Sequence, residues 1–104
     1  MSYVRFADDS DVYAYYNGKE YVCHVARMKQ NPERMEAYLA KCGDRYSDLQ
    51  QFAACYDPLD HPLANEVFTV ATGQELLDLL TSLKEQGLDV PEHPFKRLRE
   101  ELCL

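Results

Sequence analysis

The chain has 104 residues, 12% of them aromatic, and a formal net charge of −7 at pH 7. This length favours a single domain over residues 1–104, and the composition is typical of a folded chain rather than a disordered one. No apolar run approaches the roughly 20 residues of a membrane-spanning helix, and the amino terminus lacks the apolar stretch of a secretory signal. We therefore expect a cytoplasmic protein without membrane contact.

At the start of the chain, the alternation in Tyr3–Phe6 predicts a short strand, and residues 7–10 predict a turn. Asp8, Asp9 and Asp11 in and beside this turn are expected to be solvated carboxylates. Residues 11–26, DVYAYYNGKEYVCHVA, then predict a β-hairpin. Asn17-Gly18 suits a two-residue type I′ turn, in which both central positions need positive φ. Such a turn would pair Val12 with Cys23 across the hairpin.

The two faces of this hairpin differ in character. One face carries apolar residues and is expected to face the core: Val12, Ala14, Tyr21, Cys23 and Val25. The other carries Tyr13, Tyr15 and Val22 among Asp11, Glu20 and His24. Tyrosine offers rigid contact area with a polar tip, so this second face is a candidate binding surface. The alternative is that a helix covers it, because an isolated hairpin is only marginally stable.

Helical signals follow the hairpin. Asn31-Pro32 and Gly43 predict the start and end of one helix. Ser47-x-x-Gln50 predicts a capping box for a second helix, whose apolar stripe extends to Tyr56. A loop marked by Pro58 and Pro62 leads to a strand over residues 66–71, which we expect to be buried on both faces.

Two further helices end the chain. Thr72-x-x-Glu75 opens the stronger one, at about residues 73–86, and the other covers about residues 92–102. The inward residues are Leu76, Leu77, Leu79, Leu80 and Leu83 in the first and Phe95, Leu98 and Leu102 in the second, with Lys96, Arg97 and Arg99 outward. The order β-β-β-α-α-β-α-α predicts an α+β fold. An antiparallel sheet of three to four strands, with the hairpin 11–26 central, would pack with about four helices against one face.

Motifs for catalysis or metal binding are missing from the sequence. It has no glycine-rich phosphate loop, no G-x-S-x-G and no H-E-x-x-H, so we predict that the protein is not an enzyme. Asp60-His61 remains a possible acid–base pair in a loop. The cysteines at positions 23, 42, 55 and 103 lack metal or redox spacing and predict free, mostly buried thiols; a cluster of Cys23, His24, His61 and His93 around a metal is the alternative. No cofactor is predicted.

Charge is distributed unevenly. Residues 46–92 carry nine acidic side chains and a single basic one, Lys84. Such a surface repels nucleic acid and attracts basic partners, and its carboxylates can stand in for phosphates in the nucleic-acid groove of another protein. An ordinary acidic surface is the simpler explanation of the same pattern.

Both ends of the chain resemble a family of small proteins encoded by phages of actinobacteria. The start, MSYVRFADDSDVYAYYNGKEYVCHVARM, matches the family's opening MSY-x-RF and SDVY, and the end, VPEHPFKRLREEL, matches its closing helix. In that family a cysteine pair and H-x-x-x-H form a small zinc site. The matching positions here are Cys23, Ala26, Leu79 and Leu83, which implies that hydrophobic packing has replaced the metal. Residues 28–64 would be a helical insertion.

The resemblance implies a phage or prophage protein, and small acidic phage proteins include inhibitors of the anti-CRISPR type. The leading hypothesis is therefore a non-enzymatic protein that binds and inhibits a host nucleic-acid-handling defence complex through an acidic surface. Its expected partner is a host protein or ribonucleoprotein with a basic groove, and the protein itself would bind no nucleic acid. The predicted contact residues are Asp48, Asp57, Asp60, Glu66, Glu75, Asp78, Tyr13 and Tyr15.

Two alternatives remain open. One is a small protein–protein interaction or regulatory module, which could also self-associate and would use the tyrosine face of the hairpin. The other is a zinc protein with an arrangement of Cys and His ligands that the spacing does not reveal.

Overall fold

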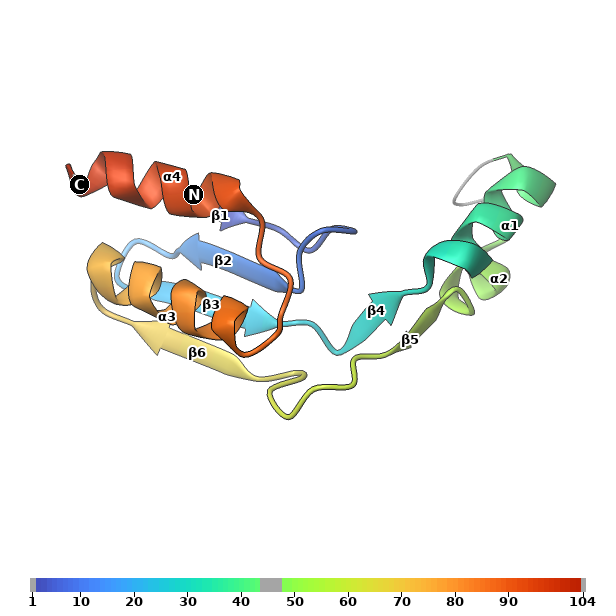
Figure 1. Cartoon of the computed structure of the whole chain (residues 1–104), viewed down its shortest axis with the longest axis horizontal. Helices are drawn as coiled ribbons and strands as arrows, with labels where there is room; N and C mark the ends of the chain where they lie inside the picture. Colours follow the sequence, from blue (N-terminus) through green and yellow to red (C-terminus); the bar gives the residue numbers. More distant parts are fainter. Residues whose placement is uncertain (1, 44–47, 104) are drawn as a thin grey trace. The chain divides into compact units, whose positions relative to one another are not determined.

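The computed structural model describes residues 2–43 and 48–103. The fold is α+β, as predicted, with a four-stranded antiparallel sheet, a two-stranded sheet and four helices among the described residues (Figure 1). The chain divides into two compact units, residues 1–26 with 61–104 and residues 27–60. The second unit covers most of the segment 28–64, whose origin as an insertion stays a prediction. None of the described helices has the length and apolar character needed to cross a membrane.

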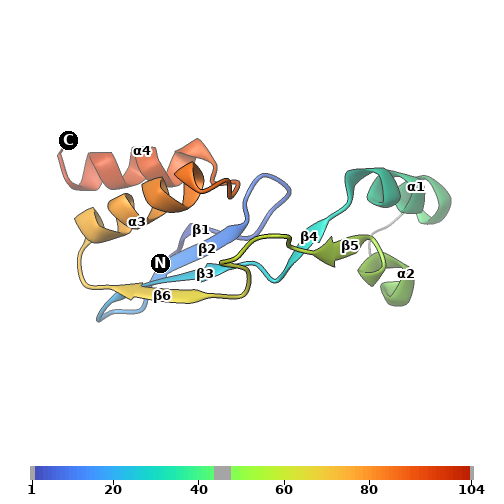
Figure 2. The ribbon, with the colours of Figure 1, turned by 60° about the horizontal axis from the view of Figure 1, so that its bottom comes forward.

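The first unit is a two-layer arrangement of sheet and helices. Its strands lie in the order β1 (Ser2–Val4), β2 (Val12–Tyr16), β3 (Tyr21–Val25) and β6 (Val67–Val70), all antiparallel to their neighbours. The hairpin strands β2 and β3 therefore hold the central positions. The helices α3 (Gly73–Glu85) and α4 (Glu92–Glu101) lie on the same face of this sheet (Figure 2).

The core of this unit lies between the sheet and these two helices. Val12, Ala14 and Cys23 point into it from the central strands and are 0% exposed, as are Leu76 and Leu80 of α3. Burying an aliphatic side chain of this size contributes about 1.5–3 kcal/mol, so this layer stabilises the unit. The cap at Thr72 is confirmed, because its side chain accepts a hydrogen bond from the backbone N–H of Glu75.

Leu79 and Leu83 were expected to pack together against β3. Leu83 is buried, at 1% exposure, and its contact with β3 stays a prediction. Leu79 is only half-buried, because it lies at the margin of the apolar stripe that Leu76, Leu80 and Leu83 form at helical spacing.

The predicted hairpin register is wrong by two residues. Val12 pairs with Val25 rather than with Cys23. The turn residues are Gly18 and Lys19, since the backbone N–H of Asn17 donates to the carbonyl of Glu20. Among the residues at this turn only Gly18 has positive φ, which is the pattern of a type II′ turn rather than type I′. A shift of two residues leaves the side chains of the two paired strands on their predicted faces.

The side chain of Asn17 explains why this turn is preferred. Its carbonyl oxygen accepts hydrogen bonds from the backbone N–H groups of Lys19 and Glu20, at 2.9 and 2.8 Å. These bonds require Asn17 to precede the turn instead of occupying it.

The strands at the two edges also differ from the prediction. The first strand ends at Val4, so Phe6 lies beyond it and is 50% exposed. β6 is not buried on both faces: it is an edge strand, and its Val67 is 54% exposed. The sequence pattern could not distinguish the two cases, because alternating β-branched and aromatic residues suit an edge strand as well as a central one.

Asp11 was predicted to be a solvated turn residue, and this prediction is wrong. The residue is buried, at 4% exposure. Its carboxylate accepts a hydrogen bond from the backbone N–H of Asp89 at 2.8 Å, and its own N–H donates to the carbonyl of Asp89 at 2.7 Å. This carboxylate thereby ties the start of β2 to the loop between α3 and α4.

The second unit contains β4 (Met28–Gln30), α1 (Pro32–Cys42), α2 (Leu49–Ala53) and β5 (Tyr56–Pro58). The predicted limits of its first helix are confirmed: Asn31 caps α1 by accepting from the N–H of Arg34, and Gly43 adopts the left-handed conformation. The pairing of β4 with β5 was not predicted, and it places Tyr56 in a strand rather than in the second helix.

The core of the second unit is small. It consists of the buried residues Met35, Tyr38 and Cys55, with Phe52 packed against them. Asp48 caps α2 through its side chain, which accepts from the N–H groups of Gln50 and Gln51; Ser47, the predicted cap, lies outside the described residues. The helices α1 and α2 belong to this unit, and α3 and α4 belong to the first.

Two glycine substitutions test this description of the backbone. We expect Gly18→Ala to lower the free energy of unfolding by about 1 kcal/mol, since φ is +95° there and nothing lies within 4 Å of an added Cβ. Gly73→Ala is the matched control. Its Cβ would make ordinary contacts at 3.6–3.8 Å, so it should be neutral or stabilising. Urea unfolding of both variants measures the difference, and an equal loss in the two would contradict the assigned turn.

Candidate functional site

The large sheet has one face that no helix of its unit covers, among the described residues of that unit. We call it the open sheet face. The backbone alternation that directs Val12, Ala14 and Cys23 into the core directs their neighbours to this opposite side. Its members are Tyr13, Tyr15, Val22, His24, Val67 and Thr69, together with Phe6, whose ring contacts that of Tyr13.

The rings of the open sheet face form a continuous row. Phe6 and Tyr13 have centroids 5.8 Å apart, and Tyr13 and Tyr15 have centroids 5.2 Å apart. Tyr15 stacks on His24, with centroids 5.7 Å apart and an interplanar angle of 17°. These separations are those of favourable aromatic pairs, so each ring restricts the motion of the next.

Polar groups are present within this row. The Tyr15 hydroxyl lies 3.4 Å from Nε2 of His24. Tyr13 and Tyr15 are half-buried, so parts of both rings face solvent. A surface of rigid rings with polar tips can bind a protein partner at low conformational cost, because few side-chain rotamers are lost on contact. The arrangement therefore resembles the central part of a protein interface.

The structure brings two of the eight predicted contact residues together. Tyr13 and Tyr15 are neighbours on the open sheet face. The six predicted acidic residues are divided between the units: Asp48, Asp57 and Asp60 belong to the second, and Glu66, Glu75 and Asp78 belong to the first. Only Glu75 and Asp78 lie on one element, three residues apart on the exposed side of α3.

Several of these carboxylates have local partners. Asp48 caps α2, and Asp78 accepts a hydrogen bond from the Gln74 side chain at 3.1 Å. Asp57 forms an ion pair with Arg34 and accepts a hydrogen bond from the Asn31 side chain. The hydrogen bond from Arg34 is the main cause that lowers the pKa of Asp57 below its ordinary value, and the bond from Asn31 adds to it. The positive charge of Arg34 thus reduces the electrostatic attraction that Asp57 could exert on a basic partner.

His61 has a structural role. Its Nδ1 accepts a hydrogen bond from the N–H of Leu63 at 3.1 Å, and its Nε2 lies 2.8 Å from the carbonyl of Gln86. These contacts assign the proton to Nε2. With both ring nitrogens engaged by the backbone, His61 is poorly placed to act as an acid–base partner of Asp60.

The cysteines were also candidate metal ligands. In residues 2–43 and 48–103 no three Cys, His, Asp or Glu side chains are gathered closely enough to hold a metal ion. Cys23 and Cys55 are buried, Cys42 is half-buried and Cys103 is exposed, so the prediction of mostly buried thiols is only partly right. Burial raises the pKa of the Cys23 thiol to about 12.

The sequence analysis did not predict two residues of the open sheet face, Phe6 and Val67. Both are large, apolar and at least half exposed. Their sequence pattern could not reveal this, because the exposure of Val67 depends on β6 being an edge strand and that of Phe6 on β1 ending at Val4.

Comparison with protein-family models, with curated proteins and with solved structures finds no match to this chain. The resemblance to proteins of actinobacterial phages therefore stays a prediction.

The burial of the thiols has a chemical consequence. At pH 8 we expect Cys103 to react with a thiol reagent such as DTNB within minutes, and Cys23 to stay unreacted, because a raised pKa keeps it in the unreactive thiol form. Cys55 should also be slow, because it is 3% exposed. The control is the same reaction in 8 M urea, where all four thiols should react at similar rates. Rapid modification of Cys23 in the folded protein would contradict its position in the core.

Proposed function

We propose that this chain is a non-enzymatic binding protein that docks on a protein partner through the open sheet face. The observation that supports this is the row of contacting rings from Phe6 to His24 on a face that its own unit leaves uncovered. Tyrosine is enriched at interfaces, and pre-ordered rings lose little entropy when a partner covers them.

The charge of the chain supports a basic partner. A net charge of −7 accelerates encounter with a positively charged protein surface and disfavours nucleic acid. The open sheet face itself consists of uncharged residues and a histidine, so charge would steer the approach while the rings supply the short-range contact.

This proposal includes the more specific function expected from the sequence. A phage or prophage protein that occupies a basic groove of a host nucleic-acid-handling complex, as an anti-CRISPR protein does, would need both properties. It would act in the cytoplasm of the host cell. The open sheet face is the proposed anchor, and the acidic residues are the proposed steering charges.

The open sheet face is tested by a double substitution, Tyr13→Ser with Tyr15→Ser. Host complexes are first captured from a bacterial lysate on the immobilised wild-type chain. Their affinity for the double variant should be at least tenfold lower, because its central rings are removed. Leu49→Ser is the control, since it removes an apolar side chain that is 65% exposed in the second unit. Unchanged affinity of the double variant, with a native spectrum, would contradict the proposal.

The acidic surface is tested separately by Glu75→Gln with Asp78→Asn, which removes two charges from the exposed side of α3. We expect a lower association rate and a weaker dependence of that rate on salt, with the dissociation rate nearly unchanged. The measurement is surface plasmon resonance at two salt concentrations. Loss of binding through faster dissociation in this variant would favour direct contact by carboxylates that imitate phosphates.

A further inference from the structure

The outer side of β6, which we call the β6 edge, has no partner strand among the described residues of the first unit. β6 is the last strand in the sheet order, and no strand lies beyond it (Figures 1 and 2). The N–H of Val25 donates to the carbonyl of Glu66 at 2.8 Å, which sets the alternation of the ladder between β3 and β6. The N–H and C=O groups of Val67 and Thr69 therefore point outward from the sheet.

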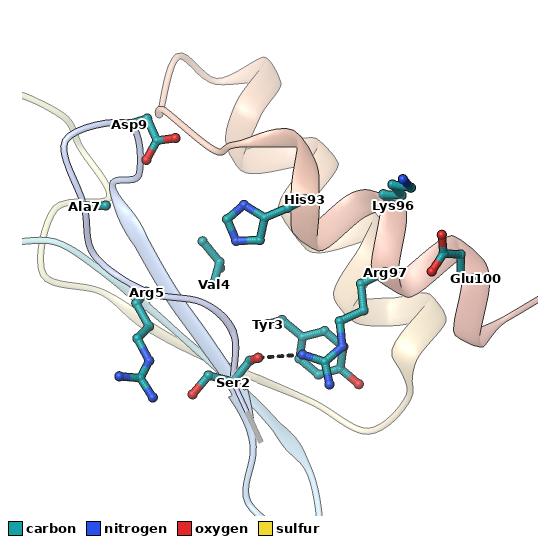
Figure 3. A pocket seen from close by; sticks show the side chains of 10 residues that line it. All are labelled: Ser2, Tyr3, Val4, Arg5, Ala7, Asp9, His93, Lys96, Arg97 and Glu100. Carbon is teal, nitrogen blue, oxygen red and sulfur yellow. Dashed lines mark hydrogen bonds between the residues drawn. The ribbon is translucent and has the colours of Figure 1, made fainter.

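The opposite edge of the sheet, at β1, is protected against a further strand. Its pairing with β2 is irregular between Ser2 and Val4. The helix α4 lies beside β1, and Nη1 of Arg97 donates to the carbonyl of Ser2 at 2.8 Å (Figure 3). Arg97 was expected to point outward, but its guanidinium lies over the Tyr3 ring, 4.7 Å from the centroid. Irregular pairing, charged side chains and a covering helix all hinder an edge from pairing with another chain.

The β6 edge lacks this protection within the described residues of its unit. The pairing of β6 with β3 is regular from Val67 to Val70. These four residues, VFTV, are uncharged and include no proline, and Val67 is 54% exposed. Main-chain hydrogen bonds can therefore add a further strand here, as in other proteins that bind an extended peptide at a sheet edge.

Negative charge predominates around the β6 edge. Residues 61–83 contain three acidic side chains, Glu66, Glu75 and Asp78, and neither Lys nor Arg. Glu66 directly precedes β6 and is exposed. The first unit as a whole has six Lys and Arg residues against twelve Asp and Glu residues. A basic segment is therefore complementary to this edge, whereas a second copy of the acidic unit would be repelled.

Glu75 lies on the side of α3 that is turned away from α4. Lys84 lies over the ring of Phe95 in α4, and about two and a half helical turns place Glu75 opposite Lys84. Gln86 follows Glu75 by about three turns and so shares its side of the helix. The carbonyl of Gln86 lies 2.8 Å from Nε2 of His61, in the segment that leads into β6. Glu75 therefore adds its charge on the β6 side of α3.

We propose that the β6 edge binds an extended, basic segment of the partner protein, which adds a strand to the sheet. This inference rests on the proposed function, because it names the part of the basic partner that meets this unit. Glu66 and Glu75 attract Lys or Arg at alternate positions of the segment. The aliphatic stems of these residues cover Phe68 and Val70, which are half-buried on the helix side. Apolar residues between them lie beside Val67 and extend the open sheet face.

The test uses the full ¹⁵N-labelled chain and the peptide KVKVKVK, acetylated and amidated at its ends, in an NMR titration at constant ionic strength. We expect saturable shifts of the amide signals of Val67 and Thr69. Hydrogen exchange of these two amides should also slow, because both would donate to the added strand. The matched peptide EVEVEVE, with the same valines, should bind about tenfold more weakly.

Thr69→Pro tests the outward hydrogen bonds. Proline removes the outward N–H and is tolerated on the free side of an edge strand, so the variant should bind KVKVKVK at least about tenfold more weakly. Thr69→Ser is the matched control, since it keeps the N–H and should bind within about twofold of the wild type. Glu66→Lys is a second variant that leaves the backbone donors in place. It should weaken binding about fivefold, because it reverses the charge beside the edge.

Equal affinity for the two peptides, or unchanged binding by Thr69→Pro, would overturn the proposal. Dimerisation of the free chain that Thr69→Pro abolishes would also overturn it, in favour of a second copy at this edge. The double variant Tyr13→Ser with Tyr15→Ser should bind KVKVKVK within about twofold of the wild type, because neither residue belongs to β6. Failure of the peptide to bind would therefore leave the test of the open sheet face unaffected.

Discussion

The first unit depends on the burial of one face of its sheet by two helices. Val12, Ala14 and Cys23 are fully buried on that side, against a helix whose Leu76 and Leu80 are equally buried. Because side chains alternate along a strand, fixing this layer also fixes which residues occupy the opposite face. The ring row of the open sheet face is thus a consequence of the core, and the core holds its rings in register across two strands.

Sequence reasoning succeeded where local chemistry decides the structure. The α+β class, the central hairpin, both of its faces and the caps at Asn31 and Thr72 follow from short-range patterns. It failed where the outcome depends on competition or on distant partners. Gly18 and Lys19 form the turn because the Asn17 side chain binds the next backbone amides, and the edge position of β6 is set by long-range pairing.

The candidate sites show the same division. Alternation along the hairpin was enough to predict that Tyr13 and Tyr15 share a surface. By contrast, Arg97 was expected to point outward, and the structure places its guanidinium over the Tyr3 ring from the other end of the chain (Figure 3). The acidic surface was predicted from the summed charge of residues 46–92, without regard to where each carboxylate lies. These carboxylates belong to two units, and Asp48 and Asp57 have local partners. For this reason the proposed function gives charge the role of steering and the rings the role of an anchor.

The central claim is that one face of the sheet is core and the other is available to a partner. Paramagnetic relaxation enhancement by a soluble, uncharged gadolinium chelate measures this directly for each side chain. The account predicts strong enhancement for the ring protons of Tyr13 and Tyr15 and for the methyl groups of Val67, with little for Val12, Ala14 and Leu80. Protection of the two tyrosine rings equal to that of Ala14 would show that the face is covered in the free protein, and would contradict the account.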